Sequence, residues 1–318
     1  PLQALYKAAK AEGEVVFWSP IDPPEVRTLV EDFSKEFPGI KVTHFEIRSD
    51  DYVARFIAEA KRGIVNFDIG TGRLVSIKSL FDRGLVQLYD DWTTIFKDLK
   101  PAAVSTDGTV LTVYSLVYPI AYNTRLVKPG EVPKSWNDLL ASKWKGRIIL
   151  EPRAGAFAYL GLKWGKEKMV NYLKKLRTQD PIFVKGGTGT AQQLVAGAAP
   201  LAVGAYVHKI LQMQNDGAPI DWAKKVSPIG AANDIVFAAK GARHPNAGKL
   251  FAGWLASDKA QKLINKKLFR GALYPGSTYI AMRDIEKNNI EVIEESLENY
   301  KRARALNKAA VQALGVLR

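Results

Sequence analysis

Polar and basic side chains follow the ends of the strands that the sequence predicts. Ligands of open α/β sheets bind beyond the carboxyl ends of the strands. Hydroxyl and phenol groups hydrogen-bond small polar anions, and arginine can hold a carboxylate or phosphate through two parallel bonds. The candidate ligand-binding residues are Ser19, Arg48, Thr71, Arg73, Tyr118, Arg153, Gly155 and Tyr206. We expect the arginines to pair with ligand charge, the tyrosines to form a wall, and the others to donate hydrogen bonds.

The charge of the chain also favours an anionic ligand. The formal net charge is +14. Residues 119–230 contain 17 Lys and Arg against 7 Asp and Glu, a net of +10, so this third of the chain holds most of the excess. Such an excess attracts an anionic ligand or partner. A solvated basic surface is the alternative interpretation.

Residues typical of catalysis or metal binding are scarce. The chain has no cysteine, which excludes disulfides, thiolate metal sites and cysteine nucleophiles. His44, His208 and His244 lie in separate predicted elements, and neither HExxH nor GxSxG is present. We therefore predict a protein that is not an enzyme and has no cofactor and no metal site.

Two further classes of ligand are disfavoured by the motifs. Residues 186–190 (GGTGT) precede a predicted helix and could present backbone amides to an anion. They lack the third glycine of a dinucleotide fingerprint and the lysine of a P-loop. The basic residues are scattered over helix faces without a nucleic-acid-binding motif, so we expect no nucleic-acid partner.

The elements that position these residues alternate between strand and helix. Strands are predicted at 14–18, 40–45, 67–70, 110–113, 120–122, 147–151, 182–184, 201–204 and 235–239, with amphipathic helices between most of them. Ser135 to Asp138 has capping-box spacing, Ser257 is placed to cap a helix, and Asp50-Asp51 to cap one starting near Tyr52. From Ile290 onward the apolar stripe predicts helix. The order predicts an α/β fold with a largely parallel sheet in each domain.

The length of 318 residues favours two domains. No Gly/Ser linker separates them, so we expect crossing strands to join the two. We expect a first lobe at 1–116 plus 234–282 and a second at 117–233 plus 283–318. No apolar run reaches the ~18 residues that span a bilayer. The sequence starts at Pro1 without a leader pattern, so we expect an export signal to lie outside it.

Five stretches resemble the bacterial extracellular solute-binding proteins of family 1, in particular the ferric, phosphonate and phosphosugar branch. They cover nearly the whole chain in the family's order. They are Ala4–Pro20 (ALYKAAKAEGEVVFWSP), Val117–Val127 (VYPIAYNTRLV), Ser135–Pro152 (SWNDLLASKWKGRIILEP), Thr190–Gly204 (TAQQLVAGAAPLAVG) and Ala242–Gln261 (ARHPNAGKLFAGWLASDKAQ).

The resemblance implies a two-lobed periplasmic-binding-protein-like α/β fold of type II, with two crossing strands and the ligand in the cleft. It also implies a periplasmic monomer that closes on a small, anionic solute by hinge motion and delivers it to an ABC permease.

Two alternatives stay open. One is a ferric receptor that uses Tyr206. Ferric members of this family commonly use consecutive tyrosines in the second lobe with His and Glu from the first, whereas residues 204–208 (GAYVH) offer one tyrosine and the first lobe offers Ser19. The other alternative is a two-lobed α/β transferase or lyase, which would need a general acid or base in the cleft.

Overall fold

The computed structural model describes residues 1–105, 110–296 and 298–316. The chain divides into two compact units. Unit 1 consists of Pro1–Ser115 and Asn233–Tyr279, and unit 2 of Leu116–Ala232 and Ile280–Arg318. Strands β5 (Leu111–Tyr118) and β11 (Ile229–Ala239) each contribute residues to both units, and the chain passes between them again after Tyr279.

Unit 1 alternates strands and helices as predicted. Its first segment contains α1 (Leu2–Glu12), β1 (Glu14–Ser19), α2 (Pro23–Glu36), β2 (Lys41–Glu46), α3 (Ser49–Ala60), β3 (Ile69–Arg73), α4 (Leu74–Asp82), β4 (Val86–Gln87), α5 (Trp92–Ile95) and the 3-10 turn η1 (Pro101–Ala103). Its second segment adds most of β11, α10 (Pro245–Ala256) and α11 (Asp258–Leu268). Strands β3, β1 and β2 run parallel, and β11 joins β3 in antiparallel pairing.

Alternating side chains give the sheet of unit 1 two apolar faces. Phe17, Ile69 and Val236 belong to the core that packs on α2, α10 and α11. Trp18, Phe67 and Phe237 belong to the core on the opposite side, with α3 and α4. Both faces are therefore covered, as parallel sheets require. The carboxyl ends of β1 and β3 emerge between these two layers of helices.

Unit 2 repeats the pattern with a second sheet. It contains β6 (Ile120–Asn123), η2 (Pro129–Glu131), η3 (Trp136–Leu140), η4 (Ser142–Trp144), β7 (Ile148–Leu150), α6 (Gly155–Trp164), α7 (Lys166–Arg177), β8 (Ile182–Phe183), α8 (Gly187–Val195), β9 (Leu201–Val203), α9 (Val207–Asn215), β10 (Ile220–Trp222), α12 (Ile280–Lys287), β12 (Val292–Glu294) and α13 (Tyr300–Leu314). The strand order is β10-β6-β9-β7-β8, and β7, β8 and β9 run parallel.

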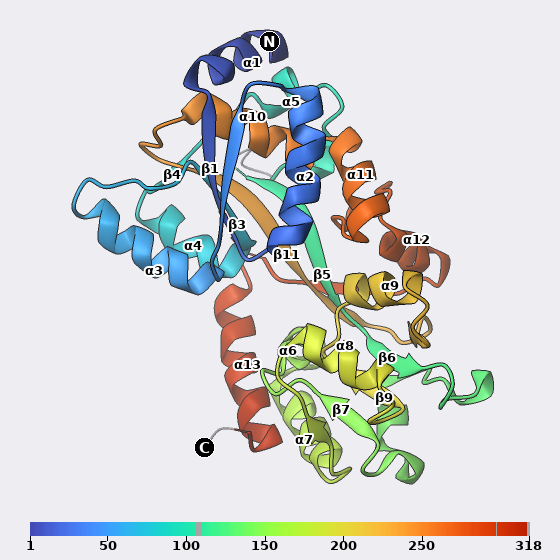
Figure 1. Ribbon diagram of the computed structural model, residues 1–318. Helices are drawn as coiled ribbons and strands as arrows, with labels where there is room; N and C mark the ends of the chain where they lie inside the picture. The colour runs from blue at the N-terminus through green and yellow to red at the C-terminus, as the bar shows by residue number, and fades with distance from the viewer. Residues whose placement is uncertain (106–109, 297, 317–318) are drawn as a thin grey trace. The chain divides into compact units, whose positions relative to one another are not determined.

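The tail of the chain differs from the prediction of a helix from Ile290. Residues Val292–Glu294 form β12, which pairs in parallel with Ile229–Ala231 of β11. Helix α13 begins at Tyr300 and runs alongside α6 and α7 (Figure 1). The helical prediction failed because Val292 and Ile293 are β-branched, and a neighbouring strand edge in unit 2 offered them backbone hydrogen bonds.

The predicted caps had mixed outcomes. Ser135 and Asp138 form the predicted capping box, although the helix that follows is the short 3-10 turn η3. The Ser257 hydroxyl accepts a hydrogen bond from the Ala260 amide at 3.2 Å, which confirms its cap. Helix α3 begins already at Ser49, so Asp50 and Asp51 lie inside its first turn and do not precede it. No helix within the described ranges is long and apolar enough to cross a membrane.

Candidate ligand-binding site

Helices α6, α8 and α9 of unit 2 begin at one edge of its sheet. Each follows one of the parallel strands β7, β8 and β9, so the carboxyl ends of these strands and the amino ends of the helices meet there. The first amides of a helix lack intrahelical partners and carry partial positive charge. This edge of unit 2 is therefore suited to an anion.

Phenol rings gather at the same edge. Tyr118 ends β5 and Tyr206 precedes α9, and their ring centroids are 5.2 Å apart in an edge-to-face arrangement. Tyr159 of α6 adds a third ring 5.4 Å from Tyr118. The His208 ring stacks on Tyr206 at 5.6 Å. The structure thus brings together the two predicted tyrosines and adds a third that the sequence analysis missed, because Tyr159 lies in a helix whose apolar pattern indicates core.

Two glycines let the helix ends approach these rings. A Cβ atom at Gly187, the first residue of α8, would lie 2.5 Å from Cε2 of Tyr206. A Cβ atom at Gly155, the first residue of α6, would lie 3.4 Å from Cε1 of Tyr118. The backbone amides at these positions therefore lie close to the phenol rings. The role of backbone donor that the sequence analysis suggested for Gly155 and for residues 186–190 stays a prediction.

Arg153 lies in the same loop between β7 and α6, paired with Glu151. Its Nε donates to Oε1 of Glu151 at 2.6 Å, and the Arg153 amide donates to Oε2 at 3.1 Å. Glu151 also accepts from the Gly186 amide at 3.2 Å, which ties the α6 and α8 loops together. Burial opposes the charge of Arg153, but Glu151 and the neighbouring phenols Tyr206 and Tyr118 raise the pKa of this guanidinium. Arg153 is therefore held in place while its side chain stays 55% exposed.

In unit 1, Ser19 lies at the carboxyl end of β1 and is fully buried. Its Oγ shares a hydrogen bond with Nε2 of His44 at 2.8 Å and accepts from the Ile21 amide at 3.3 Å. Burial lowers the pKa of His44, so its ring is neutral at pH 7. The sequence analysis found no histidine near Ser19 because His44 lies inside β2, which pairs with β1 in parallel register.

Thr71 and Arg73 lie on the same face of the sheet as Ser19. Phe17 is level with Ile69, and continuing this register places Ser19 level with Thr71. Thr71 is 1% exposed, and its hydroxyl oxygen has no hydrogen-bond partner among the described residues. It therefore does not cap α4, whose N-cap is Arg73. Arg73 is the register partner of Asp234 on β11.

The remaining predicted residue, Arg48, lies on the surface. It forms the N-cap position of α3, its side chain is 75% exposed, and its Nε is 4.0 Å from Oδ2 of Asp51. The loop itself is tied to the end of β1, because the Ile47 amide donates to the Ser19 carbonyl at 2.9 Å. Arg48 is thus near the strand end that the sequence predicted, with most of its side chain exposed to solvent.

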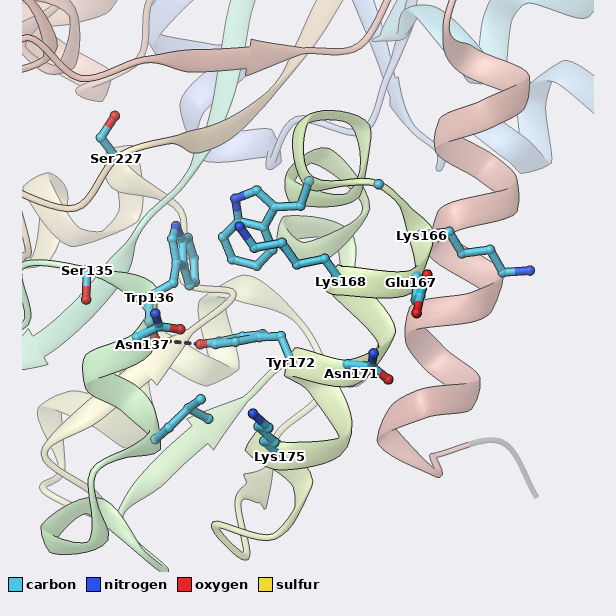
Figure 2. A pocket seen from close by; sticks show the side chains of 13 residues that line it. Ser135, Trp136, Asn137, Lys166, Glu167, Lys168, Asn171, Tyr172, Lys175 and Ser227 are labelled. Carbon is cyan, nitrogen blue, oxygen red and sulfur yellow. Dashed lines mark hydrogen bonds between the residues drawn. The ribbon is translucent and has the colours of Figure 1, made fainter.

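A groove of about 750 Å³ lies elsewhere on unit 2, between η3, α7 and the loop at Ser227. Figure 2 shows Tyr172 pointing toward η3, where its hydroxyl donates to the Trp136 carbonyl at 2.6 Å, and Lys166 pointing away. None of the predicted binding residues lines this groove. In the described part of the chain, no group of three His, Cys, Asp or Glu side chains is arranged to hold a metal ion.

Comparisons with known proteins agree with this architecture. Residues 28–278 match the family of bacterial extracellular solute-binding proteins. A protein of Haemophilus influenzae described as uncharacterized is 25% identical over 276 residues, which cover 83% of this chain and 79% of that protein.

Two solved structures are also similar. Iron-bound HitA from Pseudomonas aeruginosa has a TM-score of 0.73 at 15% identity, covering 93% of this chain and 99% of its own. The periplasmic binding protein AfuA from Actinobacillus pleuropneumoniae, with fructose-6-phosphate bound, has a TM-score of 0.70 at 20% identity, covering 96% and 99%. These similarities confirm the predicted two-lobed α/β fold. The match over 28–278 shows that the chain belongs to the bacterial extracellular solute-binding proteins, the binding components of ABC-type transport systems.

Proposed function

We propose that the protein captures a small anionic solute, such as an organic carboxylate, phosphonate or phosphorylated compound, for import through an ABC permease. In this proposal the protein works in the periplasm as a monomer. Both units contact the solute and close on it, and the solute leaves chemically unchanged. The observation that carries the proposal is the edge of unit 2 where Arg153, two phenols and the amino ends of α6, α8 and α9 meet.

The chemistry of that edge favours an anion over a neutral solute. Helix amino ends and phenol hydroxyls donate hydrogen bonds, and within the described residues the Nη atoms of Arg153 have no protein partner. Glu151 neutralises part of this charge, but its oxygens are occupied by Arg153 and the Gly186 amide. Apart from Glu151, the polar groups named at this edge are therefore mainly donors. AfuA, which has the same fold, was solved with a phosphorylated sugar, and this supports the proposal.

Calorimetric titration with fructose 6-phosphate, methylphosphonate and succinate tests the proposal. We expect at least one of these anions to bind, and Arg153→Ala and Arg73→Ala each to weaken it about tenfold or more, because hydrogen bonds to charged groups contribute ~1.5–3 kcal/mol. Arg125→Ala is the matched control, since Arg125 is exposed and follows β6 at the opposite edge of the sheet. Unchanged affinity in both arginine variants would refute this site, and compounds recovered intact would agree with a carrier.

A ferric receptor is the second candidate, favoured by the cluster of Tyr118, Tyr159 and Tyr206. Phenolate oxygens suit a hard ferric ion, and an anion bound at the same edge would supply further oxygen ligands. HitA, with the same fold, was solved with iron bound. Addition of ferric citrate would then produce a visible tyrosinate-to-iron absorption band that Tyr206→Phe abolishes. A colourless protein that binds only the organic anions would exclude this candidate.

A further inference from the structure

Asp234 of β11 is a buried carboxylate whose side chain forms no hydrogen bond or ion pair with the residues that the structure describes. It is 6% exposed, its Oδ1 atom has no hydrogen-bond partner, and no described residue forms an ion pair with its side chain within 4.0 Å. An unpartnered buried carboxylate is costly, because the charge loses its hydration and gains little in return. Burial raises the pKa of this carboxyl to about 6, so the group is still mostly ionised at pH 7.

The nearby arginines do not remove this need for a partner. Arg270 donates from Nε to Oε2 of Glu25 at 2.8 Å, in a buried ion pair. Arg73 lies opposite Asp234 on the neighbouring strand, and both arginines attract the carboxylate from a distance. Opposed residues of an antiparallel pair have Cβ atoms about 5 Å apart. A solute anion held by Arg73 would therefore lie within a few ångströms of Asp234.

A second unpartnered oxygen lies next to Asp234. Thr71 pairs with Val236 in the same ladder, so Thr71 and Asp234 are diagonal neighbours on one face of the sheet, about 7–8 Å apart. The Thr71 hydroxyl is buried, and none of the described residues forms a hydrogen bond with its oxygen. Two buried, neighbouring oxygens that can accept hydrogen bonds thus lack a donor among the described residues, beside an arginine that we place in the binding surface.

We propose that Thr71 and Asp234 form an acceptor subsite for a hydrogen-bond donor that the solute carries close to its anionic group. Such a solute is a hydroxylated anion or a zwitterion, and not a bare anion. This inference rests on the proposed function. It adds that unit 1 recognises the part of the solute beside the charge. The Asp234 carboxylate accepts a hydrogen bond from an ammonium or hydroxyl group of the solute, and the Thr71 hydroxyl accepts a second one.

The test uses three phosphates of matched length, titrated calorimetrically into the full chain. They are ethyl phosphate, 2-hydroxyethyl phosphate and 2-aminoethyl phosphate. We expect the hydroxyl or the ammonium compound to bind about tenfold more tightly than ethyl phosphate, as a hydrogen bond to a charged acceptor implies. Tighter binding of the ammonium compound identifies a zwitterion as the solute class, and tighter binding of the hydroxyl compound identifies a hydroxylated anion.

Variants show whether this preference belongs to the two oxygens. Asp234→Asn and Thr71→Val keep the shape of each side chain. Each should bring the affinity for the preferred phosphate closer to the affinity for ethyl phosphate, so that their ratio falls toward one. Asp221→Asn on β10 and Thr43→Val on β2 are matched controls that should keep the ratio. Thermal unfolding is measured for every variant, and Thr71→Val decides the question if Asp234→Asn does not fold.

The possible failures are distinguishable. Equal binding of the three phosphates, or a preference that survives in both variants, overturns the acceptor subsite and leaves the anion receptor intact. A loss of affinity for all three phosphates by the same factor shows a structural role for the two residues and also overturns the subsite. If none of the three phosphates binds, and fructose 6-phosphate, methylphosphonate and succinate also do not bind, the proposed function is refuted, and the subsite with it.

Discussion

The buried carboxyl of Asp234 makes the stability of the protein depend on pH in a direction opposite to that of most carboxylates. Burial, only partly opposed by Arg73 and Arg270, raises its pKa from 3.8 to about 6 in the folded protein. Between these values the folded protein binds more protons than the unfolded chain, so its stability falls as the pH rises from about 4 to about 6. The difference of about two pH units corresponds to about 3 kcal/mol.

Comparison with Asp234→Asn isolates this contribution, because the other titrating groups are common to both proteins. We expect the stabilities of the two proteins to become similar as the pH falls below about 4, because the carboxyl then becomes protonated in the unfolded chain as well. Above about pH 6 the variant should be more stable by up to about 3 kcal/mol. Urea unfolding followed by far-ultraviolet circular dichroism at pH 4, 5, 6 and 7 measures the difference. A difference that does not change with pH, or one that falls as the pH rises, would refute a raised pKa at Asp234.

Two further substitutions test other parts of the structure. Gly187→Ala places a methyl group 2.5 Å from the Tyr206 ring, so we expect it to displace that phenol and weaken anion binding about tenfold or more. Gly189→Ala is the control. The nearest neighbour of its methyl group would be 3.5 Å away, so it should have little effect in the same titration. Arg270→Met removes the buried ion pair between Arg270 and Glu25 and should lower the free energy of unfolding by about 3–5 kcal/mol. Adding Glu25→Gln should restore part of that loss in urea unfolding, and a double variant as unstable as the single one would contradict this account.

The sequence by itself determined the class of fold and the ends of the strands where polar residues gather. Hydrophobic periodicity and glycine or serine boundaries depend on neighbours a few residues apart, so they predict elements such as β1, α2 and the Ser257 cap without knowledge of the rest of the chain. Because parallel strands align their carboxyl ends, the list of strand ends already contained Ser19, Thr71, Tyr118 and Tyr206. The family resemblance added the two-lobed arrangement.

Only the tertiary structure decided which groups are satisfied and which are left open. Ser19 meets His44 because β1 pairs with β2, and Arg153 meets Glu151 together with the distant Gly186 amide. Asp234 lies opposite Arg73 through the pairing of strands far apart in the sequence, and the same kind of pairing made β12 a strand. Hydrogen-bond satisfaction and burial depend on contacts between remote segments, and a local pattern of residue types contains no information about these contacts.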